Sequence, residues 1–156
     1  SKEELIRAYL EARQAARKAR ISARLATCAT PRDRLLGVFD AMEDLMAAPG
    51  FRGCAFNRAA AESRPGTPVK SACDDARSWM SELFTGLARE AGAADPDHLA
   101  SQLVLLYDGA SVSGQMGAGS SAAVAAREMA ALLLDATTAK TRPPRPGSPK
   151  ATLRSR

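Results

Sequence analysis

The chain has 156 residues, of which 46% are hydrophobic and 25% are charged, and these values are typical of a globular domain with its own core. Aromatic residues make up only 4% of the sequence and alanine is abundant, so the composition favours helices over sheets. No apolar run approaches the roughly 18–20 residues that a membrane-spanning helix needs, and the first residues lack the apolar core of a signal peptide. We therefore expect an all-α, cytoplasmic protein with no membrane contact.

The net charge of +5 is unevenly distributed along the chain. Segment 139–156 carries six Lys and Arg residues and no acid, whereas the preceding residues carry 16 basic and 17 acidic ones. A nucleic-acid-binding surface over the whole domain is therefore not indicated. Four prolines and a single leucine also predict that 139–156 is a disordered tail. Such a tail is either a solvated appendage or a weak contact for nucleic acid or an acidic surface.

Helix signals begin at the first residue. Ser1 and Glu4 have the spacing of a capping box, which predicts a connector helix over 1–28. We expect its buried stripe to consist of Leu5, Tyr9, Ala12, Ala16, Ala19, Ala23 and Ala26. We expect its solvent side to be basic and to carry Arg13, Arg17, Lys18, Arg20 and Arg24.

Three more helices are predicted before residue 92. Thr30 and Pro31 have the cap-then-proline pattern of a helix start, and this second helix should end at Pro49–Gly50. A short helix of about two turns should follow and stop before Pro65. A long helix is expected over about 69–91, with Gly92 at its C-terminal end.

The stretch 95–117 predicts a fifth helix with two dissimilar halves. Asp95 and Pro96 again form a helix start. One face carries Leu99, Leu103, Leu106, Ala110, Ser113 and Gly117. The bulky first half should be buried on more than one side, and the small residues of the second half suit the close approach of another backbone. A last helix over about 121–138 carries Val124, Met129, Leu132, Leu133 and Ala136.

Residues with catalytic or metal-binding potential are few. Cys28, Cys54 and Cys73 form no C-x-x-C pair, and His98 is the single histidine, so neither a zinc site nor a di-iron site is expected. The cysteines are expected to be unpaired thiols, with a redox-sensing Cys54 as the alternative. No nucleophile has a plausible base nearby in the pattern. We therefore expect no enzyme activity, no metal and no cofactor.

Three stretches resemble TetR-type (tetracycline repressor-like) transcriptional regulators. SKEELIRAYLEAR at 1–13 resembles the segment that directly follows the family's helix-turn-helix. FRGCAFNRAAAE at 51–62 resembles a Gly-Cys-x-(apolar)-Asn-x-x-x-Glu segment of one family branch, and LYDGA at 106–110 resembles the penultimate helix. The resemblance implies a six-helix ligand-binding and dimerisation domain over 1–138. The family's helix-turn-helix precedes SKEEL and is absent from this sequence, so these residues alone should not read a DNA sequence.

The resemblance also implies three kinds of site. One is a cavity for a small hydrophobic or amphipathic effector, with candidate lining residues Phe39, Met42, Phe56, Trp79, Leu83, Gln102, Leu106 and Tyr107. Another is a homodimer interface, in which the last two helices form a four-helix bundle with their copies through Ala110, Ser113, Gly114, Ala122, Ala125, Ala126 and Leu133. The third is Lys2, which would contact a DNA phosphate.

Each implied site has a plainer alternative. The cavity candidates could equally be ordinary core residues, because helical spacing is the same in both cases. Lys2 could be a solvated first-turn lysine. The implied function is effector sensing and dimerisation in a transcriptional regulator, a repressor, whose DNA affinity changes when a ligand binds. The alternative function is a stand-alone helical module that binds a ligand or a protein and has no DNA role.

Overall fold

The computed structural model describes residues 1–139, which fold into α-helices and one π-helical segment. The elements are α1 (Lys2–Ala26), α2 (Pro31–Ala47), α3 (Ala55–Glu62), α4 (Pro68–Glu90), α5 (Pro96–Ser113), the π-helix η1 (Gly114–Ala118) and α6 (Ser121–Ala139). The predicted all-α fold with six helices is confirmed. Nearly all of the predicted tail, from residue 140 onwards, lies outside the described residues.

Local signals in the sequence set the helix starts. The Ser1 side chain accepts a hydrogen bond from the Glu4 amide, and the Glu4 side chain reaches back to residue 1, so the predicted capping box is present. Thr30, Thr67 and Asp95 each accept a hydrogen bond from a backbone amide three residues further on, and a proline follows each of them. These side chains accept hydrogen bonds from backbone N–H groups that would otherwise lack a partner in the first helical turn.

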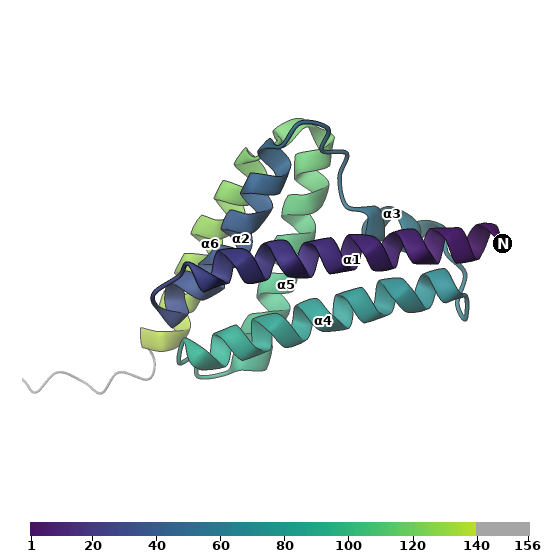
Figure 1. The fold of residues 1–156 in the computed structure, drawn as a ribbon. Coiled ribbons are helices and arrows are strands. Elements are labelled where there is room, and N and C mark those ends of the chain that lie inside the picture. Colours follow the sequence, from purple (N-terminus) through teal and green to yellow (C-terminus); the bar gives the residue numbers. More distant parts are fainter. Residues whose placement is uncertain (140–156) are drawn as a thin grey trace, which may run out of the picture.

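The helices form two packed groups that α1 and α4 join. Figure 1 shows α1 and α4 side by side along the length of the molecule, with α3 near the N-terminal end of α1. At the other end, α2 and α5 both pack against α6. This arrangement places α3 apart from the α2–α5–α6 group.

Two clusters of buried side chains correspond to these groups. The main core is centred on Phe39, Phe84 and Tyr107, whose ring centroids lie 5.7–6.3 Å apart. The small core consists of Leu10, Phe56, Val69, Cys73 and Ala76. It lies where α1, α3 and the first half of α4 meet, so α3 is held by a much smaller apolar cluster than the other helices.

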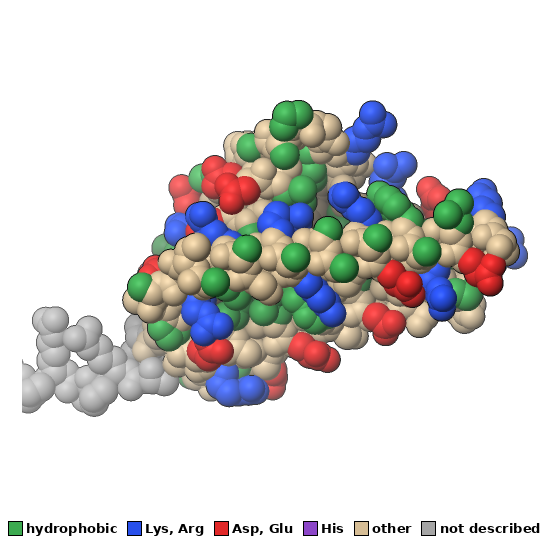
Figure 2. Space-filling view, viewed as in Figure 1, with side chains coloured by type: hydrophobic (Ala, Val, Ile, Leu, Met, Phe, Trp, Pro, Cys, Tyr) green, Lys and Arg blue, Asp and Glu red, His purple; other side chains and the backbone are tan. Residues whose placement is uncertain are grey.

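The buried face of α1 differs from the prediction. Leu5 and Tyr9 are 73% and 54% exposed, and every alanine of the predicted stripe is exposed as well. The buried residues are instead Leu10, Arg17, Ile21 and Leu25. Alanine gains little from burial, whereas a buried Leu or Ile gains about 1.5–3 kcal/mol, so the larger side chains set the orientation of the helix. Figure 2 shows the outer face of α1 as small apolar side chains between Lys and Arg side chains.

The faces of α5 and α6 also required correction. Leu99, Leu103 and Ala110 of the predicted α5 face are buried, but Ser113 and Gly117 at its end are exposed. The face is interrupted because the chain changes from α- to π-helix at Gly114, which adds a residue to the turn. On α6 the inward side chains are Ala123, Ala126, Ala130 and Leu134. No helix within residues 1–139 is long and apolar enough to cross a membrane.

Candidate functional site

Two small cavities lie beside α1. One of them, which we call the arginine cavity because Arg13, Arg17 and Arg20 border it, has a volume of about 50 Å³ and is bordered by α1, α2, α5 and residues 51–56. The α4 cavity, about 80 Å³ in volume, is bordered by α1, α3, α4 and α5. The residues that border both are Arg17, Cys54, Phe56 and Tyr107. These four side chains therefore lie between the two cavities. If the side chains moved, the two cavities would join into one larger pocket.

Arg17 is at the centre of this arrangement. Only 9% of Arg17 is exposed, whereas the other cations of α1 are exposed except Arg20, which is half-buried. One terminal nitrogen of Arg17 donates hydrogen bonds to the Ala76 carbonyl, at 3.0 Å, and to the side-chain oxygen of Gln14. The guanidinium carbon lies 4.6 Å from the centre of the Phe56 ring and 5.6 Å from that of Trp79. Burial lowers the pKa of Arg17, because the charged form loses its hydration.

Arg17 forms no ion pair among the described residues, and the carboxylate of Asp108, which borders the α4 cavity and pairs with Arg77, acts on its charge only from a distance. None of the ion pairs formed within residues 1–139 involves Arg17, or Arg13 and Arg20 on the same side of α1. The Nε atoms of Arg17 and Arg20 are both buried and have no hydrogen-bond partner among these residues. Arg24, one turn further along α1, is by contrast paired with Asp40 at 3.2 Å. The arginine cavity thus combines three cations with no carboxylate in its lining.

The α4 cavity has a different charge pattern. Asp74 and Asp108 border it, and these carboxylates pair with Lys70 and with Arg77, the latter at 2.7 Å. The Cys73 thiol donates a hydrogen bond to the Phe56 carbonyl over 3.7 Å, and burial raises its pKa. Burial likewise raises the pKa of Tyr107, which borders both cavities. Tyr107 is therefore a neutral phenol at neutral pH.

The predicted cavity residues fall into three groups. Met42, Phe56 and Tyr107 border one or both cavities. Trp79 is half-buried and lies over the cations of Arg17 and Lys18. The remaining candidates border neither cavity, since Phe39 is fully buried in the main core and the half-buried ones pack elsewhere on α4 and α5: Leu83, Gln102 and Leu106. The sequence pattern could not separate these positions, because all of them have core spacing.

The most informative site residue, Arg17, was predicted on the solvent side. The sequence does contain a signal for its burial, because Leu10, Arg17, Ile21 and Leu25 recur at seven- and four-residue steps. Choosing the largest apolar side chains as the buried stripe would have placed Arg17 among them. Arg20, which also borders the arginine cavity, was likewise expected on the solvent side. Met46 borders it too and was not among the predicted lining residues.

Lys2 lies at the other end of α1. Its side chain is exposed and borders a groove of about 580 Å³ between the first turns of α1 and the α3 region, together with Ile6, Tyr9 and Ala59. No nucleic acid is part of the structure, so its contact with a DNA phosphate stays a prediction.

The predicted dimer residues are only partly accessible. Ala110, Gly114 and Ala126 are buried within the monomer and offer little surface to a second copy, and the dimer itself stays a prediction. A Cβ atom at Gly114 would lie 2.9 Å from the sulfur of Met46, so a larger residue there would disturb the monomer itself. Ser113 and Ala125 are exposed, and the partly exposed candidates are Ala122 and Leu133.

A different set of residues gives the outer surface of α5 and α6 its apolar character. We call it the α5–α6 stripe; it comprises Leu105 and Val112 of α5 and Val124, Met129 and Leu132 of α6. The exposed fractions range from 38% for Val124 to 69% for Leu105 and Leu132. Because α5 packs against α6, these exposed apolar side chains lie on two neighbouring helices, which makes this surface a candidate for an interaction.

Comparisons with known proteins place this fold in a family. No family model matches the sequence, and no curated protein does. A TetR-family transcriptional regulator from Streptomyces coelicolor is 28% identical with a TM-score of 0.83, over 88% of this chain and 74% of that one. A protein assigned to the TetR regulators, from Streptomyces avermitilis, is 32% identical with a TM-score of 0.73, over 88% of this chain and 75% of that one. The chain belongs to the TetR family of transcriptional regulators.

Proposed function

We propose that residues 1–139 form the effector-sensing and dimerisation domain of a transcriptional regulator that acts as a repressor. The observation that carries the proposal is the position of α5. Its inner side brings Tyr107 and Ser111 to the cavities, and its outer side brings Leu105 and Val112 to the α5–α6 stripe. One helix therefore takes part in both the candidate effector site and the candidate dimer surface.

The connector role of α1 follows from the same cavities. Arg17 borders both of them and is hydrogen-bonded to α4 through the Ala76 carbonyl. A ligand that changes this contact would favour one position of α1 relative to α4 over another. In the proposed mechanism, α1 passes this change to a DNA-reading helix-turn-helix that lies N-terminal to Ser1 in the regulator. The effector acts only if it binds the two positions with different affinity.

The dimer in this proposal is built on the α5–α6 stripe. A two-fold arrangement places the same patch of both copies face to face, so the apolar side chains of one copy cover those of the other. Burying five large side chains from each copy would remove from water the largest apolar side chains that α5 and α6 expose. Ser113 and Ala125 are small enough to let the helices approach closely within such a contact.

The oligomeric state of the purified chain tests this surface. We expect a dimer by light scattering coupled to size exclusion, and a monomer of unchanged helical content for Leu132→Glu. A carboxylate at this position would be buried without a partner in the dimer and solvated in the monomer. Leu5→Glu is the matched control, because Leu5 is 73% exposed on α1, compared with 69% for Leu132, and lies outside the stripe. A dimer that survives Leu132→Glu and Val112→Glu would contradict the proposed interface.

The DNA-reading part has a separate test. In the proposal, the gene encodes about fifty residues with a helix-turn-helix pattern directly before Ser1. Sequencing upstream of the Ser1 codon checks this. A stop codon or an unrelated domain at that place would favour a stand-alone ligand-binding module instead.

A further inference from the structure

We propose that the effector is a small aromatic carboxylate, and that its carboxylate binds Arg17 and Arg20 in the arginine cavity. This inference rests on the proposed effector-sensing function and adds the chemical class of the ligand. It starts from the buried cation of α1 and from what surrounds it.

The first argument is the uncompensated charge. A buried cation is normally paired, because taking it out of water without a partner costs several kcal/mol. Arg17 is nine-tenths buried, yet it has only the neutral partners Gln14 and Ala76 in addition to aromatic rings. A structural role would be served better by an apolar side chain or by an acid in direct contact with the guanidinium group. The cost is understandable if the partner is a molecule that binds and leaves.

The second argument is the donor set that remains open. The Nε atoms of Arg17 and Arg20 are buried without an acceptor, and both residues border the arginine cavity. A carboxylate has two oxygens that each accept such N–H groups, and guanidinium groups bind carboxylates with matched, charge-assisted geometry. Arg13 borders the same cavity and adds to its positive potential.

The third argument decides between the two cavities. No acid borders the arginine cavity, whereas Asp74 and Asp108 border the α4 cavity. Arg17 and Arg77 border the α4 cavity as well, so its charges balance, whereas the arginine cavity has cations alone. The anionic group of a ligand is therefore bound more favourably in the arginine cavity than past Phe56 and Tyr107 in the α4 cavity.

The remaining lining indicates the rest of the molecule. Met42, Met46, Phe51 and Phe56 give the arginine cavity an apolar surface with two aromatic rings. Its volume of about 50 Å³ is far below the roughly 300–1,000 Å³ of pockets for drug-sized ligands. Methionine side chains adapt easily, so the cavity can enlarge to accept one ring. A compound with one aromatic ring and one carboxylate fits this chemistry once the cavity has enlarged.

Matched pairs of acids and amides test the proposal. Benzoate and phenylacetate carry the carboxylate, and benzamide and phenylacetamide have the same shape without the charge. Binding is measured by thermal shift and calorimetry on the wild-type chain and on Arg17→Gln, Arg20→Gln and Lys18→Gln. Lys18→Gln is the matched control, since Lys18 is an exposed cation of α1 that does not border the arginine cavity.

We expect both acids to stabilise the wild-type chain and Lys18→Gln, and neither amide to do so. Arg17→Gln should weaken acid binding tenfold or more, because a hydrogen bond to a charged group is lost. Its melting temperature without ligand should not fall, because an uncompensated buried charge is removed. Arg20→Gln, whose side chain is less buried, gives the same test if Arg17→Gln does not fold. Phenylacetate should also slow alkylation of Cys54, which borders both cavities.

The outcomes separate this inference from the proposed function. Equal binding of acids and amides, or acid binding unchanged in both arginine variants, would overturn the carboxylate assignment and leave effector sensing in place. The same holds if a wider screen finds neutral or cationic ligands but no acids. Absence of stabilisation by any class of compound would overturn both.

Discussion

The main core and the small core of this domain differ in what they tolerate. In the main core, Phe39, Phe84, Leu99 and Leu103 have no exposed surface at all, and the cluster draws on five helices. In the small core, five buried residues hold three helices together. Arg17, the one charged residue that is buried among those described, lies against the small core, over the ring of Phe56. The comparison indicates that the main core supplies stability and that the room for a ligand lies where the small core, through Phe56, meets Met42 and Tyr107 of the main core.

The short helix α3 shows why the small core is the adaptable one. Phe56 is its one buried residue, and Cys54 at its N-cap position makes no side-chain capping bond. A helix with so few stabilising contacts opens at a lower free energy than one inside a large core. Phe56 is also part of the wall between the two cavities. Movement of α3 therefore changes the candidate site directly and the main core very little.

The largest expected loss of stability comes from replacing one aromatic side chain of each core by alanine. Phe84→Ala should lower the free energy of unfolding by about 3–5 kcal/mol, because a fully buried ring is lost and its surroundings cannot collapse. Phe56→Ala should cost about 1.5–3 kcal/mol, which is the transfer term alone, since cavities already exist beside its ring. Urea denaturation followed by circular dichroism measures both. Equal losses would show that the two cores do not differ.

The next effect concerns the connection between the two regions. Gly53 precedes α3 and has a φ of +86°, and a Cβ atom there would lie 2.2 Å from the side-chain oxygen of Gln115 in η1. Gly53→Ala should cost about 1–2 kcal/mol, from left-handed backbone strain plus the displaced Gln115 side chain. The control is Gly50→Ala, where φ is +83° and nothing lies within 4 Å of a Cβ atom.

The difference between these two variants isolates the contact with Gln115. Because Gln115 is exposed and flexible, we expect thermal denaturation to give Gly53→Ala an excess loss below about 1 kcal/mol. A much larger excess would mean that α3 and η1 are firmly coupled, and that the small core does not adapt independently.

Much of the fold could be predicted from the sequence, because its signals are local. Caps at Ser1, Thr30 and Asp95 and the prolines after two of them mark helix starts without reference to the rest of the chain. The orientation of α1 could not be predicted from alanine spacing, since alanine is nearly indifferent to burial. The π-helix at Gly114 could not be predicted either. It ends the buried face of α5, so that Gly117, which the helical spacing placed on that face, is exposed.

The candidate site was less predictable than the fold. Met42, Phe56 and Tyr107 were chosen because of the family resemblance, and they do border the cavities. Arg17 was not predicted, because several neighbouring Lys and Arg residues on one helix normally indicate a solvent-exposed face. Its importance depends on its burial without an ion pair among the described residues, and the packing of α1 against α4 is needed to see this.

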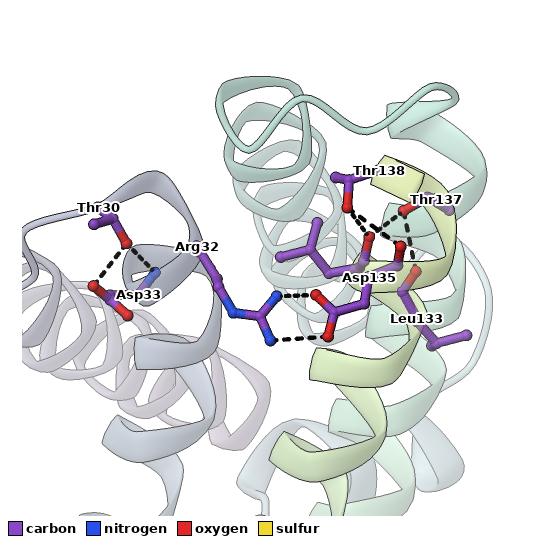
Figure 3. A network of polar contacts seen from close by, with 8 residues as sticks. Thr30, Arg32, Asp33, Leu133, Asp135, Thr137 and Thr138 are labelled. Carbon is purple, nitrogen blue, oxygen red and sulfur yellow. Dashed lines mark hydrogen bonds and ion pairs between the residues drawn. The ribbon is translucent and has the colours of Figure 1, made fainter. Parts of the chain in front are cut away.

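The smallest effect on stability is expected from an exposed ion pair between α2 and α6, two helices of the main core. Figure 3 shows Arg32, in the first turn of α2, paired with Asp135 of α6, beside the Thr30–Asp33 cap. The two side chains are 43% and 57% exposed, so their coupling in a cycle of Arg32→Gln, Asp135→Asn and the double variant should be about 0.2–1 kcal/mol. In 1 M salt, where the Debye length is about 3 Å, the coupling should vanish. Because the apolar contacts between α2 and α6 persist in every variant, the main core should keep its stability without this pair. A coupling above 1 kcal/mol that survives salt would mean that surface charge, and not burial alone, sets the stability of that half of the molecule.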